Sequence, residues 1–294
     1  MKNTILFCLT GFLIFIFSSC SKQVYDNLWQ STTVKADGNS KEWEIPLRYY
    51  DEKSKLQYTI TNDSNNLYVC IRATDEQTQL KIIRSGMKLW IDTTGKNKKI
   101  TGLFFPIESG NEQRNSSAGH KHEDTARANT KQFQKPSSKS IKARYNKAPK
   151  EMQLVGFKPP LGGIMPLQNE SGIAASIDWD SIGIMTYEAI LPFKTFYKKS
   201  LAAADSAKKI GITLIIPALA APPSSGGHRE GGGGMGGGMG GGMGGMRGAG
   251  GGYGGGGRRG GGNYGGGNTG TGMLYENNTI KMIIKPAIPS KHSQ

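Results

Sequence analysis

The chain has 294 residues, a formal net charge of +15 and 43 glycines. Its composition excludes a core that runs through the whole length, because residues 226–270 hold 29 of the glycines and residues 108–150 are rich in Lys, Ser, Asn and Gln. Both stretches lack the apolar side chains that offset chain entropy, so we predict that both are disordered. About 190 residues remain, which fits one domain.

Most of the positive charge lies in these two stretches. Residues 111–150 carry ten Lys or Arg against three acids, a net of +7, and residues 226–270 carry four Arg against one Glu, a net of +3. We interpret them as solvated tethers. The alternative is contact with anionic surface polymers or lipid head groups.

The first residues are typical of an export signal. Lys2 precedes an apolar run over residues 4–17, and Ser18 and Ser19 lead into Cys20. This order resembles the lipobox of bacterial lipoproteins, in which the cysteine is lipidated and becomes the mature N-terminus. The resemblance implies a signal peptide over residues 1–19 and a lipid-anchored protein of the cell envelope, in the outer membrane on either face. An uncleaved membrane anchor is the alternative, although the run is shorter than the ~20 residues that a spanning helix needs.

Alternating apolar and polar residues predict a series of short strands. Two of them, on either side of a polar turn at 62–66, form a hairpin. A helix is expected only over residues 193–207, where Ala and Lys gather after a proline. Many strands with few helices predict an all-β fold, a two-sheet antiparallel β-sandwich of jelly-roll or immunoglobulin-like type. The expected strands are 56–61, 67–73, 87–92, 103–105, 152–157, 172–178, 187–192, 210–216 and 280–284.

The chain then divides into one interrupted domain. In chain order the parts are a signal peptide (1–19), a tether (20–35), the first part of the sandwich (36–107), a basic insertion (108–150), the second part (151–225), a Gly/Met-rich loop (226–270) and a final strand with its tail (271–294). The alternative is two domains divided near 110–150. Cys70 is the one cysteine after Cys20, so no intrachain disulfide is expected, and its strand-like surroundings predict a small buried side chain.

Four segments, in order, resemble the carbohydrate-binding module family 9-like domains. They are ADGNSKEWE (36–44), NDSNNLYVCIRATD (62–75), GMKLWIDTTGK (86–96) and YEAILPF (187–193). The resemblance implies a two-sheet sandwich related to the DOMON domains, which bind sugars or haem. It also implies that tryptophan rings stack on a saccharide, with Trp43 and Trp90 at family positions.

Each candidate ligand residue has a plainer alternative. Trp43 and Trp90 could stack on a sugar or pack in the core. Trp179, which follows Asp178, has sugar-like surroundings that also suit an ordinary strand end. Asp37 and Asp92 could hold calcium through oxygen ligands or cap turns without a metal. Haem is not expected, because the histidines lie in the polar, glycine-rich or terminal stretches (His120, His122, His228 and His292).

The glycine-rich loop suggests two further ligands. Its thioethers are soft ligands that select Cu(I), although methionine that merely interrupts a low-complexity repeat is the preferred interpretation. Its Arg-Gly segments are typical of single-stranded RNA binding, but export makes nucleic acid an unexpected partner. The methionines are Met235, Met239, Met243 and Met246.

Catalysis is not expected. Glu188 and Asp178 could pair as the acid and base of a glycosidase, but no nucleophile triad, HExxH motif or P-loop is present. We therefore expect a non-catalytic envelope lipoprotein whose sandwich binds a saccharide or an envelope polymer. The alternatives are a scaffold that binds other proteins through its loops and, third, copper capture.

Overall fold

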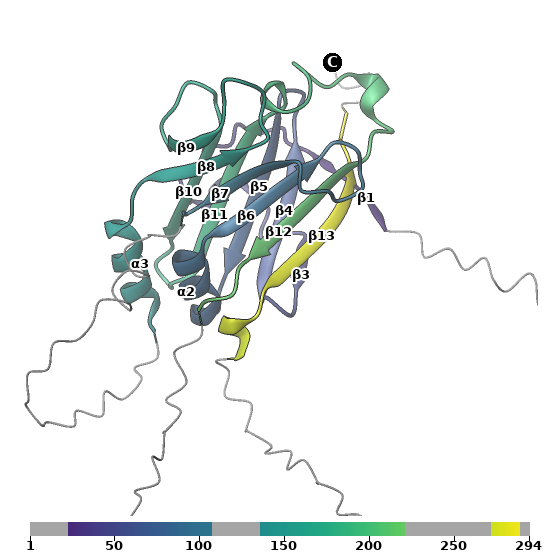
Figure 1. Ribbon diagram of the computed structural model, residues 1–294. Coiled ribbons are helices and arrows are strands. Elements are labelled where there is room, and N and C mark those ends of the chain that lie inside the picture. Colours follow the sequence, from purple (N-terminus) through teal and green to yellow (C-terminus); the bar gives the residue numbers. More distant parts are fainter. Residues whose placement is uncertain (1–22, 108–135, 221–271, 289–294) are drawn as a thin grey trace, which may run out of the picture. The chain divides into compact units, whose positions relative to one another are not determined.

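The computed structural model describes residues 23–107, 136–220 and 272–288, which form two β-sheets around one apolar core (Figure 1). A seven-stranded sheet, with β6, β12 and β13 in front in Figure 1, has β6 and β12 near its middle. Its strands are, in spatial order, β1 (Val24–Asp26), β13 (Asn278–Lys285), β12 (Ile210–Ile216), β6 (Met87–Asp92), β7 (Thr101–Phe105), β8 (Glu151–Val155) and β9 (Gly163–Pro166).

The second sheet has six strands. Their order is β10 (Ala174–Trp179), β11 (Met185–Pro192), β5 (Asn66–Ala73), β4 (Leu56–Asn62) and β2 (Leu28–Trp29), with β3 (Tyr49–Asp51) also paired to β4. The predicted two-sheet sandwich is confirmed, as are all of the predicted strands and the β4–β5 hairpin. The sheets are mixed, because β1 runs parallel to β13 and β2 parallel to β4. These edge strands have two or three residues, too few for an alternating pattern to reveal.

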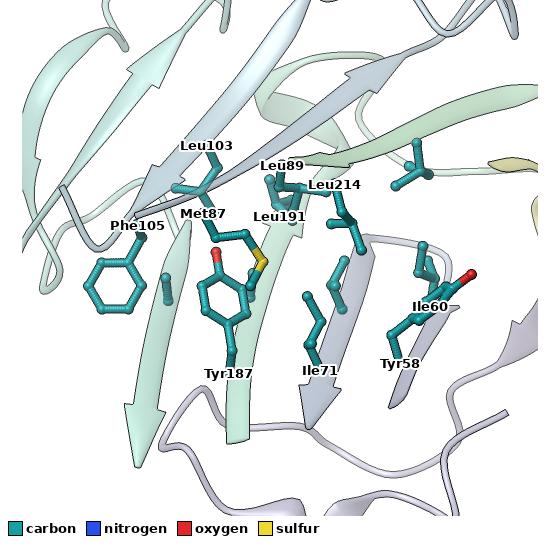
Figure 2. Packing of buried hydrophobic residues seen from close by; sticks show 14 of the residues in the cluster. Tyr58, Ile60, Ile71, Met87, Leu89, Leu103, Phe105, Tyr187, Leu191 and Leu214 are labelled. Atoms are coloured by element: carbon teal, nitrogen blue, oxygen red, sulfur yellow. The ribbon is translucent and has the colours of Figure 1, made fainter. Parts of the chain in front are cut away.

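The core lies between the sheets because each strand alternates apolar and polar positions. Figure 2 shows apolar side chains from both sheets meeting there. Those labelled are Tyr58, Ile60, Ile71, Tyr187 and Leu191 from the six-stranded sheet and Met87, Leu89, Leu103, Phe105 and Leu214 from the seven-stranded sheet. Cys70 is fully buried on the other face of β5, as expected for a small apolar side chain, and burial raises the pKa of its thiol.

Strands on either side of both long interruptions pair with each other. Leu103 of β7 lies opposite Leu154 of β8, and Leu214 of β12 lies opposite Ile280 of β13. Each interruption therefore leaves and re-enters the same sheet between neighbouring antiparallel strands. A division into two domains near 110–150 does not fit these pairings.

Two α-helices were not predicted, and the helix expected over 193–207 was wrong. That segment forms two short 3-10 turns, η3 (Phe193–Thr195) and η4 (Ala203–Asp205). The carboxylate of Asp205 accepts hydrogen bonds from the Ala202 amide (2.8 Å) and from the Lys198 ammonium (2.6 Å), which stabilises an irregular loop in place of a helix.

The two helices are α2 (Glu76–Ser85) and α3 (Ser138–Lys147), side by side at one end of the sandwich (Figure 1). Helix α3 corrects the prediction that all of 108–150 is disordered. Its Ile141 and Tyr145, one turn apart, are 1% and 6% exposed and belong to the core. Two apolar residues in a polar stretch are too few to give a helical period. Neither α2 nor α3, which are the α-helices of the described residues, is long and apolar enough to cross a bilayer.

A buried lysine on α2 fixes the chain where it re-enters after residue 271. The Lys81 ammonium donates to the carbonyl of Met273 (2.8 Å), to the carbonyl of Glu276 and to Asn278 Oδ1. Burial lowers the pKa of Lys81. These bonds tie η5 (Gly272–Tyr275) and the start of β13 to the helix, so β13 begins at a fixed point.

Replacing Tyr145 with Ala tests whether α3 belongs to the folded core. The ring lies 5.7 Å from Trp179 and 6.4 Å from Phe105, so its loss leaves a cavity. We expect the free energy of unfolding, measured by urea denaturation, to fall by about 3–5 kcal/mol. Replacing the exposed Lys147 of the same helix should change it by less than about 0.5 kcal/mol. Equal effects of the two substitutions would contradict the packing of α3.

Candidate functional site

The outer face of the six-stranded sheet is covered by residues 34–47. Val34, Trp43 and Leu47 of this segment pack on Tyr68 and Cys70 of β5 and form a second apolar cluster. Trp43 is 7% exposed. Trp43 therefore packs in this cluster and stabilises the contact between the covering segment and the sheet.

Glu188, in the middle of β11, fixes the covering segment. Its carboxylate is fully buried and accepts hydrogen bonds from Gly38 N (2.7 Å), Asp37 N (3.0 Å) and Trp43 Nε1 (2.6 Å). Burial raises the pKa of Glu188 to about 7, against the opposing effect of these hydrogen bonds. Gly38 has φ +83°, and a Cβ there would lie 2.4 Å from the amide nitrogen of Asp178, so the close approach requires glycine.

Three carboxylates meet under this segment. Asp37, Glu42 and Glu188 each offer an oxygen within 4.8 Å of the others. Calcium takes six to eight oxygen ligands. Both Glu188 oxygens already accept hydrogen bonds, and Asp37 Oδ1 accepts one from Asn39 N (2.8 Å). Asp37 and Glu188 therefore have a structural role in the segment, whereas the buried Oε2 of Glu42 accepts no hydrogen bond from a described residue.

Asp92 caps the turn between β6 and β7. Its oxygens accept hydrogen bonds from Thr94 N (2.8 Å), Thr94 Oγ1 (2.6 Å), Lys96 N (2.9 Å) and Lys98 N (2.9 Å). Burial alone would raise the pKa of Asp92, but these hydrogen bonds lower it. Of the two alternatives for Asp92, the arrangement matches the turn cap.

Trp179 and Asp178 contribute to the packing of the helices. Trp179 is 7% exposed, and its Nε1 donates to Gln79 Oε1 of α2 (2.9 Å). Asp178 forms an ion pair with Lys142 of α3 (2.6 Å). These contacts hold Trp179 and Asp178 against the helices, and Trp179 also lines a pocket together with Lys142, Asp180 and Gly183.

Glu188 and Asp178 share the outer face of the six-stranded sheet, but the backbone at Gly38 lies between them. Gly38 donates to Glu188, and its Cα lies against the Asp178 backbone. A glycosidase needs a sugar between its two carboxyl groups. The covering segment takes up that space.

Trp90 has different surroundings, on the outer face of the seven-stranded sheet. It alternates with the core residues Leu89 and Ile91, and its partly exposed ring lies 5.0 Å from that of Phe104 at 68°, an edge-to-face pair. Gly102 lies beneath both rings, and a Cβ there would come within 2.8 Å of Trp90 and 2.9 Å of Phe104. The Lys88 ammonium is 5.4 Å from the centre of the Phe104 ring.

Three buried polar atoms without partners lie on this outer face, and one of them belongs to Trp90. Its Nε1, the hydroxyl of Thr213 and Oδ1 of Asn97 are buried and have no hydrogen-bond partner among the described residues. Thr213 lies opposite Trp90 in register and is 2% exposed. Asn97 packs on Gly211, two residues before Thr213, where a Cβ would lie 2.5 Å from Asn97 Oδ1. Unpaired buried polar atoms cost about 1–3 kcal/mol each, which makes them candidates for ligand contacts.

We call Lys88, Trp90, Asn97, Phe104 and Thr213 the aromatic face, and it is the candidate site. Only Trp90 was predicted from the sequence. Gly102 inside a strand was an available signal, because glycine there often marks a close approach. The other predicted site residues, Cys20 and the methionines Met235, Met239, Met243 and Met246, lie outside the described residues, as do the four histidines.

Comparisons of the chain with protein-family models, with curated proteins and with solved structures gave no match. The chemistry of the aromatic face and the sequence are therefore what bear on function.

Replacing Glu188 with Gln tests the buried carboxylate. Because the pKa is about 7 in the folded state and near 4.5 in the unfolded chain, the folded state holds the proton more tightly. This contribution to stability is present below pH 4.5 and is lost as the pH rises to about 7. We expect the Gln variant to lack this decline when urea denaturation is measured at pH 4.5, 6 and 8.

The exposed Glu170 provides the control. Its replacement with Gln should leave the decline between pH 4.5 and 7 as it is in the unmodified protein. A decline that persists in the Glu188 variant would show that another group causes it.

Proposed function

We propose that the protein is a lipid-anchored protein of the cell envelope whose aromatic face binds a saccharide chain without cleaving it. One observation carries the proposal: the outer face that presents the Trp90–Phe104 pair also holds three buried polar atoms that no described residue pairs. An apolar ring surface and unused hydrogen-bonding groups are the two features that sugar recognition combines.

The chemistry of the three atoms suits hydroxyl groups. Trp90 Nε1 can only donate, Asn97 Oδ1 can only accept, and the Thr213 hydroxyl can do both. A sugar hydroxyl also donates and accepts, so the hydroxyls along a saccharide chain suit such groups while the C–H face of a sugar ring lies on the aromatic side chains. The groups lie on a sheet surface, which suits an extended chain.

The lipid anchor is supported by the leader and by the position of the first strand. Val24 of β1 follows Cys20 by four residues, and an extended chain covers at most about 3.6 Å per residue. Acyl chains on Cys20 would therefore hold the start of β1 within about 15 Å of the bilayer surface. Binding without cleavage is supported by the covering segment, which separates Glu188 from Asp178.

Replacing Trp90 with Ala tests the site. We expect binding to the glycans that the unmodified protein retains on a glycan array to weaken by ten-fold or more, because the stacking surface is lost. Trp29, 37% exposed on β2 of the other sheet, provides the matched control, and its replacement with Ala should leave binding unchanged. No binding by the unmodified protein across plant, host and bacterial glycans would contradict the proposal and favour the scaffold alternative.

Replacing Thr213 with Val separates binding from stability. Valine keeps the shape and removes a buried hydroxyl without a described partner, so the free energy of unfolding should stay the same or rise by about 1 kcal/mol. Glycan affinity, measured by calorimetry, should nevertheless fall several-fold. A variant that is destabilised, or one that binds as tightly as the unmodified protein, would show that the hydroxyl has no role in the site.

Replacing Cys20 with Ser tests the anchor. We expect the unmodified chain to fractionate with membranes and to carry acyl groups on Cys20 in mass spectrometry, and the Ser variant to lose both properties. Replacing Cys70, which is fully buried in β5, should not release the protein from membranes. A free Cys20 thiol with the leader still attached would contradict the lipid anchor.

A further inference from the structure

We infer that the saccharide bound by the aromatic face is anionic, and that lysines around this face hold its carboxylate, sulfate or phosphate groups. The inference rests on the proposed function and names the class of its ligand. It is carried by the placement of five lysines from four separate parts of the chain, which we call the lysine rim: Lys88, Lys96, Lys98, Lys209 and Lys281.

Two of these lysines lie on the sheet itself. Lys88 belongs to the aromatic face, with its ammonium near the Phe104 ring. Lys281 is exposed on β13, directly opposite Thr213 in register. Both therefore border the row of side chains that contains Trp90.

The other three lie around the turn between β6 and β7. Asp92 accepts hydrogen bonds from the amides of Lys96 and Lys98, which curves the turn back toward the outer face. Lys209 packs against Gly95 of the turn, where an added Cβ would lie 2.7 Å from the Lys209 Cβ. All three residues are exposed.

The rim has little compensating negative charge. No ion pair joins its lysines to a carboxylate of the described residues, and the carboxylate of Asp92 is buried within the turn. Nearby acids pair with other lysines: Asp205 with Lys198 (2.6 Å) and Asp26 with Lys285 (3.7 Å). Unpaired charges of one sign on one face raise the local potential and attract polyanions. Lysine, a compact and freely rotating point charge, suits anionic groups along a flexible polymer.

A polymer with hydroxyl groups fits this surface better than a lipid bilayer does. Trp90 and Phe104 are partly buried against Gly102, whereas residues that insert into acyl chains need to project from the surface. The unpaired polar atoms of this outer face would also gain nothing from hydrocarbon.

The test compares glycans that differ only in charge. The full-length chain in detergent is titrated with polygalacturonate and with its methyl ester, and with dextran sulfate and dextran, at 50 and 300 mM NaCl. We expect at least one anionic polymer to bind ten-fold or more tightly than its neutral counterpart, with affinity that falls as salt rises.

A variant with Lys96, Lys98, Lys209 and Lys281 replaced by Gln should lose about ten-fold in affinity for that polymer, since each exposed charge contributes a few tenths of a kcal/mol. A matched variant replaces four exposed lysines outside the rim and should bind within two-fold of the unmodified protein. These control residues are Lys35, Lys41, Lys139 and Lys147.

The outcomes separate this inference from the proposed function. Equal binding of neutral and charged polymers, or an unaffected rim variant, would overturn the anionic ligand and leave saccharide binding in place. Loss of binding in the rim variant with full binding by Trp90→Ala would support a charged surface and overturn the role of the aromatic face. Binding to phosphatidylglycerol vesicles with no binding to any glycan would overturn both.

Discussion

The buried carboxylate of Glu188 is the interaction on which the covering of the six-stranded sheet depends. It draws together the amides of Asp37 and Gly38 and the Trp43 indole, and so holds residues 34–47 on the six-stranded sheet. That sheet is then covered on its outer face by the protein's own chain. The seven-stranded sheet has no comparable cover among the described residues, and Trp90 on its outer face is partly exposed.

Asp92 has the corresponding role on the seven-stranded sheet, with the opposite electrostatic outcome. At Glu188 burial outweighs three hydrogen bonds and the pKa rises, whereas at Asp92 the hydrogen bonds of the turn outweigh burial and the pKa falls. Asp92 therefore stays charged at neutral pH and keeps Asn97 and the rim lysines in place. The carboxylate under the covering segment thus has its pKa raised toward neutrality, whereas the carboxylate under the turn stays ionised there.

The sequence predicted the strands well because alternation follows directly from the geometry of a half-buried strand, and the same alternation placed Trp90 opposite Leu89 and Ile91. It could not decide among the tryptophans. Trp43 and Trp179 are in contexts like that of Trp90, but each is covered by a partner distant in sequence: Glu188 for Trp43 and Gln79 for Trp179. Helix α3 was missed for a related reason, because tertiary packing of two residues, and no strong local period, stabilises it.

The aromatic face depends on residues that the sandwich does not require. The Thr213 hydroxyl is buried without a described partner, and Gly102 and Gly211 weaken the strands in which they lie. Both glycines have the same effect, since one admits the two aromatic rings and the other admits Asn97 to the sheet surface. Residues that lower the stability of a fold are expected at functional sites. Because a β-sandwich by itself specifies no ligand, these residues, together with the unpaired lysines beside them, are what point to the chemistry of the partner.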